Sequence, residues 1–501
     1  MSILKANSGN RFSLFAFLFI SLSFIGAKIY QVSTVEPFIR ESYALSWDNY
    51  GYYLHLPAFV IHHDIGLEDR SWLDALNKKY QQDRPFYQAW PGQKNRLVNV
   101  YPVGAAIFNL PFFLLGHLSA KISGYDADGL SPPYQYAMII SALFYGILGF
   151  WFLRKLLIRY FNDKLSALIM LLLAFATNLF YYASYDCNLP HITLFAADTL
   201  ILILTIKWHE QQKSKYAIGI GLLIGLITVT RPSEIVWLFI PLFWGIQNWK
   251  TFREKLILLK RNFAQVFLLI TGMVLVGSLQ LFYWKYTCGK WFSNNHVEGF
   301  DFFRPFTLQV LFSYKKGWLL YTPLMTFAIL GLFLLYKKNK PLFFPFMIFF
   351  LSNLWFISSW ECWWYGGTFG QRSFVESYGL MAIPLGYFLQ SAFAKNIRKY
   401  VTALVLGFFL FLNQLQMWQL QVGILNGYLM TKAYYWKVFG KTKIDERWKS
   451  LLEVDRGNLP PLDSAGTGYT HKTIMLQDFE NAVSANGFLI CDTLGSKSKK
   501  S

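Results

Sequence analysis

Residues 12–30 read FSLFAFLFISLSFIGAKIY. A helix of about 20 apolar residues is long enough to cross the hydrocarbon core of a bilayer, so this block can span a membrane. At least ten more apolar blocks follow before residue 420, and short basic or aromatic-polar segments separate them. The recurrence predicts an all-α polytopic membrane protein.

The composition indicates the same class of protein. Hydrophobic residues make up 54% of the 501 residues and charged residues only 15%, whereas a soluble chain is about one quarter charged. The net charge of +19 would suit a nucleic-acid backbone. The basic residues instead lie in short loops between apolar blocks, which is the positive-inside pattern. We therefore expect the lipid bilayer, and no nucleic acid, as a partner.

The basic loops predict the topology. With these loops and the N-terminus in the cytoplasm, about eleven spans result. A signal peptide is the alternative for the first block, but Tyr30-Gln31-Val32 is a poor cleavage site, so an uncleaved span is favoured. The predicted spans are residues 12–30, 134–152, 166–184, 190–207, 216–230, 234–248, 264–284, 318–336, 342–359, 374–392 and 399–420.

This topology divides the chain into a transmembrane part, residues 1–420, and an outward C-terminal tail, residues 421–501. The first outward loop, residues 31–133, is long. Pro102 and Pro111 interrupt its apolar block 100–118, and counting that block as a span would place the next basic loop outside. We therefore expect a re-entrant or interfacial helix there, packed in protein or facing a cavity.

The four cysteines, Cys187, Cys288, Cys362 and Cys491, all fall outside in this topology. Outward loops of a bacterial inner membrane lie in an oxidising compartment, where thiols can pair. Three pairings are possible, and the sequence does not choose among them.

The first outward loop carries the candidate catalytic base. If a helix begins near Asp48, then Asp48, Tyr52 and His55 lie on one face, and the opposite side with Tyr53 and Leu54 suits lipid. A carboxylate in this position can take a proton from an acceptor hydroxyl. The alternative is an N-cap, because Asp is among the best capping residues.

Lys94, Arg96 and Tyr101 lead into the block 100–118. Cations at the membrane face suit a phosphate in the headgroup plane. Ordinary contact with lipid headgroups is the alternative.

Three later outward turns carry further candidates. Asp186 and His191 lie near the membrane face, where ionisable residues are costly and often functional. Arg231 can reach a phosphate or pair with a neighbouring glutamate. Trp363 and Arg372 lie in an aromatic, glycine-rich loop, in which aromatic faces can stack on sugar rings or form an interfacial belt.

Together these features resemble the C-type (GT-C) membrane glycosyltransferases, such as protein O-mannosyltransferases and lipid A aminoarabinose transferases. The resemblance covers residues 12–420, mostly in topology. It implies transfer of a sugar from a polyprenyl-phosphate donor, with Asp48 as the acidic residue of the first loop, Lys94 or Arg96 at the carrier phosphate, and Asp186 as a second acidic residue. Relatives often have two adjacent acids where this chain has Asp48-Asn49, so the cofactor, including any divalent metal, is left open.

The predicted function is therefore glycosyl transfer on the periplasmic side of a bacterial inner membrane, to a glycan, lipid or protein acceptor. The alternative is a multi-spanning transporter or a flippase for lipid-linked sugars. A transporter predicts internal repeats and several polar residues in its spans, whereas this chain has few intramembrane charges, with Asp198 the main one.

Overall fold

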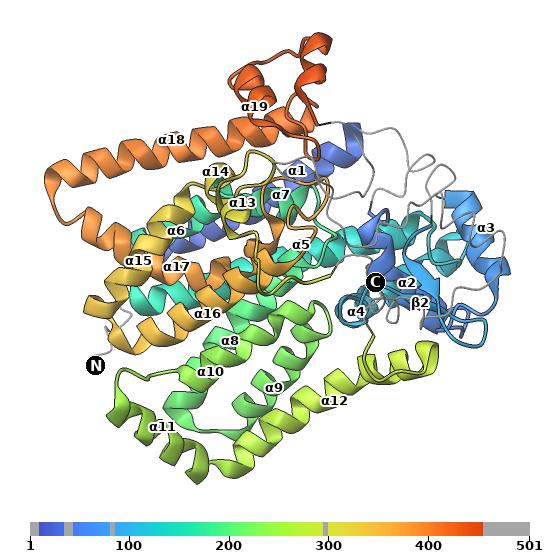
Figure 1. The fold of residues 1–501 in the computed structure, drawn as a ribbon, viewed down its shortest axis with the longest axis horizontal. Helices are drawn as coiled ribbons and strands as arrows, with labels where there is room; N and C mark the ends of the chain where they lie inside the picture. Colours follow the sequence, from blue (N-terminus) through green and yellow to red (C-terminus); the bar gives the residue numbers. More distant parts are fainter. Residues whose placement is uncertain (1–9, 35–43, 81–85, 294–298, 454–501) are drawn as a thin grey trace, which may run out of the picture. The chain divides into compact units, whose positions relative to one another are not determined.

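The computed structural model describes residues 10–34, 44–80, 86–293 and 299–453. In this part of the chain the regular structure is helical apart from one two-stranded sheet (Figure 1). The chain forms two compact units. Of the described residues, unit 1 comprises 10–34, 139–276 and 300–453, and unit 2 comprises 44–80, 86–138, 277–293 and 299. Of the predicted tail, residues 421–453 belong to unit 1, and residues 454–501, with Cys491, lie outside the described residues.

The helices confirm the prediction of an all-α, multi-pass membrane protein. Seven helices among the described residues are long and apolar enough to cross a bilayer. They are α1 (Arg11–Thr34), α4 (Gly104–Ser123), α5 (Pro132–Tyr160), α8 (His191–Gln211), α12 (Phe263–Cys288), α16 (Lys340–Ser359) and α18 (Asn396–Gln421). The eleven-span topology and its orientation stay predictions.

The remaining helices of unit 1 are shorter. They are α6 (Asp163–Phe175), α7 (Leu179–Ser184), α9 (Ser214–Thr228), η1 (Pro232–Leu238), α10 (Phe239–Phe243), α11 (Trp249–Arg261), α13 (Thr307–Phe312), α14 (Trp318–Tyr321), α15 (Leu324–Lys338), η2 (Arg372–Ser377), α17 (Tyr378–Ala392), α19 (Lys432–Val438) and η3 (Glu446–Leu451).

Several predicted spans are interrupted. The block 166–184 is divided between α6 and α7, because Thr177 and Asn178 use their side chains for other hydrogen bonds. The block 318–336 is divided between α14 and α15 at Thr322-Pro323, since proline lacks an N–H group and restricts the residue before it. The blocks 234–248 and 374–392 begin with the 3₁₀ turns η1 and η2. Ionisable side chains lie at these interruptions, and two of the candidate clusters described below are built there.

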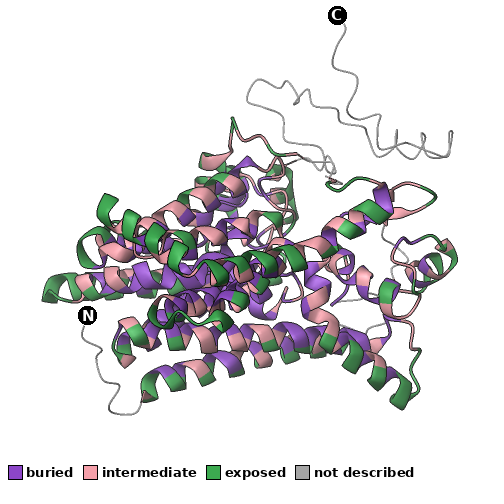
Figure 2. Ribbon diagram, turned by 90° about the horizontal axis from the view of Figure 1, so that it is seen from below, coloured by how far each residue is buried: buried purple, intermediate pink, exposed green. Residues whose placement is uncertain are grey.

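Close helix packing in unit 1 depends on small residues. A Cβ atom at Gly331 of α15 would collide with the backbone of Pro384 in α17, so glycine is what allows these two helices to approach. Buried, half-buried and exposed residues are mixed along the helices (Figure 2), and α8 is mostly buried whereas α12 is mostly not. The amphipathic helix α11 lies outside the candidate spans, exposing Trp249 and Ile257 and burying Lys255.

Unit 2 contains α2 (Asp48–Val60), α3 (Arg70–Tyr80), α4 and a β-hairpin, and parts of α5 and α12. Strands β1 (Ala89–Pro91) and β2 (Leu97–Asn99) pair antiparallel, with Trp90 opposite Val98. Helix α4 runs through Pro111 without a break, so the interruption expected at this proline is not found. Proline removes one intrahelical hydrogen bond, which membrane helices tolerate when the freed group is satisfied locally.

Candidate functional site

Asp48 is the first residue of α2. Its Oδ1 accepts hydrogen bonds from two phenols, Tyr101 Oη at 2.7 Å and Tyr87 Oη at 2.9 Å. The N-cap position belongs to Trp47, and no side chain caps this helix. The alternative that Asp48 serves as the N-cap is therefore not what the structure shows, and the carboxylate points toward aromatic side chains from the hairpin region.

The local sequence explains how Asp48 is positioned. Gly51 lies one turn after Asp48, and a Cβ atom there would collide with the ring of Tyr101. Its absence lets the ring lie against the backbone of α2 with the hydroxyl at Asp48. Trp47 has a φ of 51°, which is unusual for a bulky residue, and its carbonyl accepts from Gln88 Nε2 at 3.1 Å. Such backbone strain, worth about 1–3 kcal/mol, is concentrated at functional sites.

Tyr101 is a permanent hydrogen-bond donor. Burial raises its pKa well above the ordinary value, and the charge of Asp48 and the neighbouring Tyr87 raise it further. The phenol therefore stays protonated and stabilises the ionised carboxylate. This arrangement keeps Asp48 available as a proton acceptor.

His55 and Tyr52 lie on the same face of α2, as the sequence predicted. His55 Nε2 lies 2.8 Å from the Tyr101 carbonyl oxygen, and the Tyr52 and Tyr101 ring centroids are 4.7 Å apart. Burial lowers the pKa of His55 to about 4, although the hydrogen bond to Tyr101 opposes this. A neutral His55 donates a hydrogen bond to that carbonyl and so helps to hold the backbone of Tyr101 in place. The opposite face was expected to meet lipid, and this was wrong, because Tyr53 and Leu54 are buried in unit 2.

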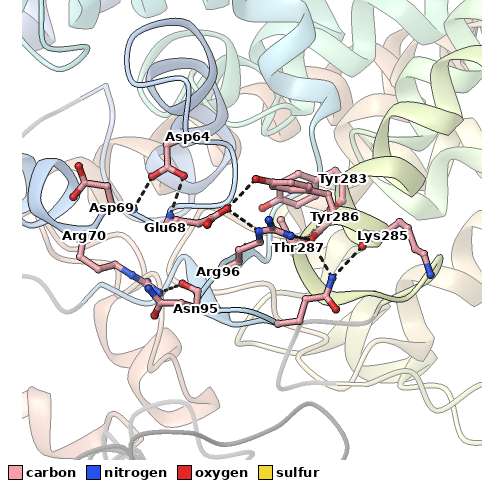
Figure 3. Close-up of polar contacts among 11 residues, drawn as sticks. Asp64, Glu68, Asp69, Arg70, Asn95, Arg96, Tyr283, Lys285, Tyr286 and Thr287 are labelled. Carbon is pink, nitrogen blue, oxygen red and sulfur yellow. Dashed lines mark hydrogen bonds and ion pairs between the residues drawn. The ribbon is translucent and has the colours of Figure 1, made fainter.

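Arg96 is engaged by protein groups. Its Nε lies 2.7 Å from Glu68 Oε1, its Nη1 donates to the Tyr286 carbonyl at 2.8 Å, and its guanidinium lies 3.8 Å from the centre of the Tyr286 ring (Figure 3). Hydrogen bonds from Arg96 and Tyr286 lower the pKa of Glu68. Arg96 thus holds the hairpin against the last turn of α12, where cations interact favourably with the carbonyl ends. Lys94 lies exposed in the hairpin turn, with a φ of 51°.

In unit 1, His191, Arg231 and Glu376 form a buried network. Glu376 Oε1 accepts from His191 Nδ1 at 3.0 Å and from Arg231 Nη1, and Arg231 Nη2 donates to Ser373 Oγ at 3.1 Å. Glu234, the sequence neighbour with which Arg231 was expected to pair, is 3.9 Å away. The stronger partner of Arg231 is therefore Glu376, from a different element.

A second cluster in unit 1 contains Asp186, Lys316 and Arg372. Lys316 is fully buried and donates to the Thr368 carbonyl. Burial lowers the pKa of Lys316 well below its ordinary value, the positive charges of Arg372 and Lys315 add to this, and Asp186 opposes it. Asp186 and Arg372 are half-buried and Lys316 is fully buried, and a bound anion would favour the charged form of the lysine.

Trp363 is buried near this cluster, with 6% of its surface exposed. Its ring centroid is 5.8 Å from that of Trp364, and its carbonyl accepts from Gln371 Nε2 at 2.8 Å. The indole is thus packed against protein, and little of it is open for stacking on a sugar.

No disulfide joins any two of the three cysteines in the described part of the chain. Among the same residues, no group of three or more His, Cys, Asp or Glu side chains is arranged to hold a metal ion. In the first loop, the ring of His62 stacks on the ring of Trp72, with the two centroids 4.0 Å apart. Trp72 Nε1 also donates a hydrogen bond to Asp64 Oδ2 at 3.2 Å.

The structure therefore brings the predicted residues together in two separate sets. Unit 2 contains Asp48, Tyr52, His55 and Tyr101, with Lys94 and Arg96 in the hairpin; unit 1 contains Asp186, His191, Arg231, Trp363 and Arg372. Sequence reasoning missed Tyr87. It placed the Lys315-Lys316 pair in a predicted outward loop, against the positive-inside trend, where an anionic lipid headgroup or packing against acidic loops would explain it.

No protein-family model matches this sequence, and the comparison with curated proteins finds no match.

Proposed function

We propose that the protein is a glycosyltransferase that moves a sugar from a polyprenyl-phosphate donor to an acceptor on the outer face of a bacterial inner membrane. The observation that carries this proposal is the carboxylate of Asp48, which two phenols fix at the start of α2. It lies in the predicted first outward loop, where the resemblance to GT-C enzymes implies the acidic residue.

The proposed chemistry at Asp48 is general-base catalysis. The acceptor oxygen forms a bond with the anomeric carbon of the sugar, while the bond between that carbon and the phosphate oxygen breaks. The polyprenyl phosphate leaves with the bonding electrons, and the acceptor proton passes to Asp48. Because the donor is already activated by its phosphate leaving group, a positioned base is the main requirement at the acceptor.

The Lys316 cluster in unit 1 is a separate support for a phosphate-bearing ligand. Lys316 is fully buried and Arg372 half-buried, and a bound anion would favour the protonated lysine and interact strongly with both side chains. Arg96 is a weaker candidate for this role, since Glu68 and Tyr286 already engage its guanidinium. We assign phosphate recognition in unit 1 to Lys316 and Arg372.

The donor class can be tested with purified protein in liposomes. Polyprenyl-phosphate donors with labelled hexoses or pentoses are supplied with a membrane extract as acceptor source, and release of polyprenyl phosphate is measured. We expect turnover with at least one lipid-linked donor and none with the corresponding nucleotide sugars. Turnover with nucleotide sugars alone would contradict the proposal.

A transporter or flippase is the second candidate, and a specific observation favours it. Asp198 lies within the candidate span α8 and is fully buried, close to Glu234 and Glu376, where the 3₁₀ turns η1 and η2 replace regular helix. Buried acids beside interrupted helices are typical of transport sites. In the same liposomes, movement of labelled lipid across the bilayer without release of polyprenyl phosphate would favour this function.

A further inference from the structure

Asp198 lacks the contacts that a buried carboxylate normally has. Its side chain has 0% of its surface exposed, neither carboxyl oxygen makes a hydrogen bond of good geometry among the described residues, and the nearby donor is the indole N–H of Trp237, which Glu234 shares. It lies in α8 two turns after His191, and it is close enough to Glu234, Glu376 and Arg231 to interact electrostatically.

The neighbouring carboxyls do not supply the missing partner. Glu376 Oε1 is bound by His191 and Arg231, and Glu376 Oε2 has no partner in the described part of the chain. Glu234 Oε1 accepts from Ser233 Oγ at 3.2 Å, with Arg231 at 3.9 Å. The guanidinium of Arg231 is therefore paired mainly with Glu376. Asp198 makes no ion pair within 4 Å with any described residue.

The other elements packed against α8 do not supply a cation that pairs with Asp198. Besides the groups already named, their charged or titratable side chains in unit 1 are Lys215 and Tyr216 of α9, Arg372 of η2, Tyr378 and Tyr387 of α17, Tyr181 and Tyr182 of α7, and Tyr145, Arg154, Lys155, Arg159 and Tyr160 of α5. Of the α5 cations, Arg159 pairs with Glu210 and Arg154 binds Ser13 and the Asn10 carbonyl. Lys215 is exposed near the start of α9. Even if both Arg231 and Arg372 are counted, three carboxyls face two guanidinium groups.

An ionised carboxylate with neither a hydrogen bond nor a cation is very costly in an apolar interior, and such a group takes up a proton instead. The single indole N–H of Trp237 lies beside both Asp198 and Glu234 and can serve only one of them at a time. Protonation of Asp198 would remove its negative charge and so relieve the repulsion between the two carboxyls.

We propose that Asp198, with Glu234 as its partner carboxyl, is a proton-binding site inside the membrane part of unit 1. The ligand is a proton, held by Asp198 at neutral pH and released when an alternative path or partner becomes accessible. The site is independent of sugar transfer at Asp48, so its test does not depend on the proposed enzymatic activity.

Infrared spectroscopy of the protein in nanodiscs tests this site. At neutral pH we expect a carbonyl-stretching band of a protonated carboxylic acid, which moves to lower frequency when the side-chain carboxyl carbon of aspartate carries a heavy isotope. Asp198→Asn should abolish the band. Asp163→Asn is the matched control and should leave the band unchanged, because Asp163 accepts hydrogen bonds from the backbone N–H groups of Phe12 and Ser13.

The isotope measurement uses the unmodified protein, so it remains informative if Asp198→Asn fails to fold. Absence of an isotope-sensitive band in the wild type would overturn the proposal, as would its persistence in folded Asp198→Asn. Exchange of choline chloride for sodium chloride at constant pH should leave the band unchanged. Its loss in sodium would show that the site holds a metal cation in place of the proton, and would also overturn the proposal.

Discussion

Replacing Tyr101 by phenylalanine removes one of the two phenols that donate to Asp48. The lost hydrogen bond is 2.7 Å long and has a carboxylate as its acceptor. Hydrogen bonds to charged groups contribute about 1.5–3 kcal/mol. Each pH unit of a proton equilibrium corresponds to about 1.4 kcal/mol, so this loss should shift the ionisation of the general base by about 1–2 pH units.

The direction of the shift follows from the donor. The Tyr101 hydroxyl stabilises the ionised form of Asp48, so its removal should move the acidic limb of the pH–rate profile to higher pH. The assay is the release of polyprenyl phosphate in liposomes, measured as a function of pH for the wild type and Tyr101→Phe. Tyr87→Phe should move the limb in the same direction, because Tyr87 donates to the same oxygen at 2.9 Å.

Tyr216→Phe is the matched control, since its hydroxyl donates to Gln211 and belongs to unit 1. Its pH–rate profile should coincide with that of the wild type. An unchanged acidic limb in folded Tyr101→Phe, or a shift to lower pH, would refute the role assigned to the phenol.

Three further predictions concern unit 1. Gly331→Ala should lower stability by about 1–3 kcal/mol, because the added methyl group meets the backbone of Pro384, which cannot rotate away; thermal unfolding in detergent measures this, and an unchanged melting temperature would contradict it. Burial lowers the pKa of Lys255 from 10.5 to about 7, so the unfolded chain binds more protons between these pH values and stability should rise with pH across that range. Lys255→Met should flatten this dependence, and an equal slope in both proteins would exclude Lys255 as its source. Arg231→Met should destabilise by about 3–5 kcal/mol, because it leaves Glu376 buried without its main cation; Arg231→Met combined with Glu376→Gln should recover part of this loss, whereas additive losses in the double variant would show that the two side chains do not act as a pair.

The sequence predicted the helical, multi-pass class, because apolar length determines where a membrane helix can form, whereas seven described helices, not eleven, are long and apolar enough to cross a bilayer. It did not predict the interruption at Asn178. There, Asn178 Nδ2 donates to the Gln371 carbonyl at 3.2 Å, and Tyr378 Oη donates to Asn178 Oδ1 at 2.6 Å. These partners lie about 200 residues away along the chain, so no local pattern could reveal them.

The candidate site in unit 2 was also predicted in part. Helical spacing was sufficient to place Asp48 and His55 on one face. The phenol of Tyr87 reaches Asp48 only because the intervening segment folds back onto α2, and Gly51 matters only because Tyr101 packs against it. Both facts depend on tertiary packing, which the sequence alone does not specify.

The proposed function requires that the carboxylate of Asp48 accepts the proton of the sugar acceptor. The most direct measurement compares sugar release from a polyprenyl-phosphate donor by the wild type, Asp48→Asn and Asp128→Asn, at equal amounts of folded protein. Asp128 is a suitable control, because it also accepts a hydrogen bond from a phenol of unit 2, Tyr80 at 2.7 Å. General-base catalysis contributes about 10²–10⁴-fold, so Asp48→Asn should lose about that factor while Asp128→Asn keeps wild-type turnover. Wild-type turnover in Asp48→Asn would contradict the claim.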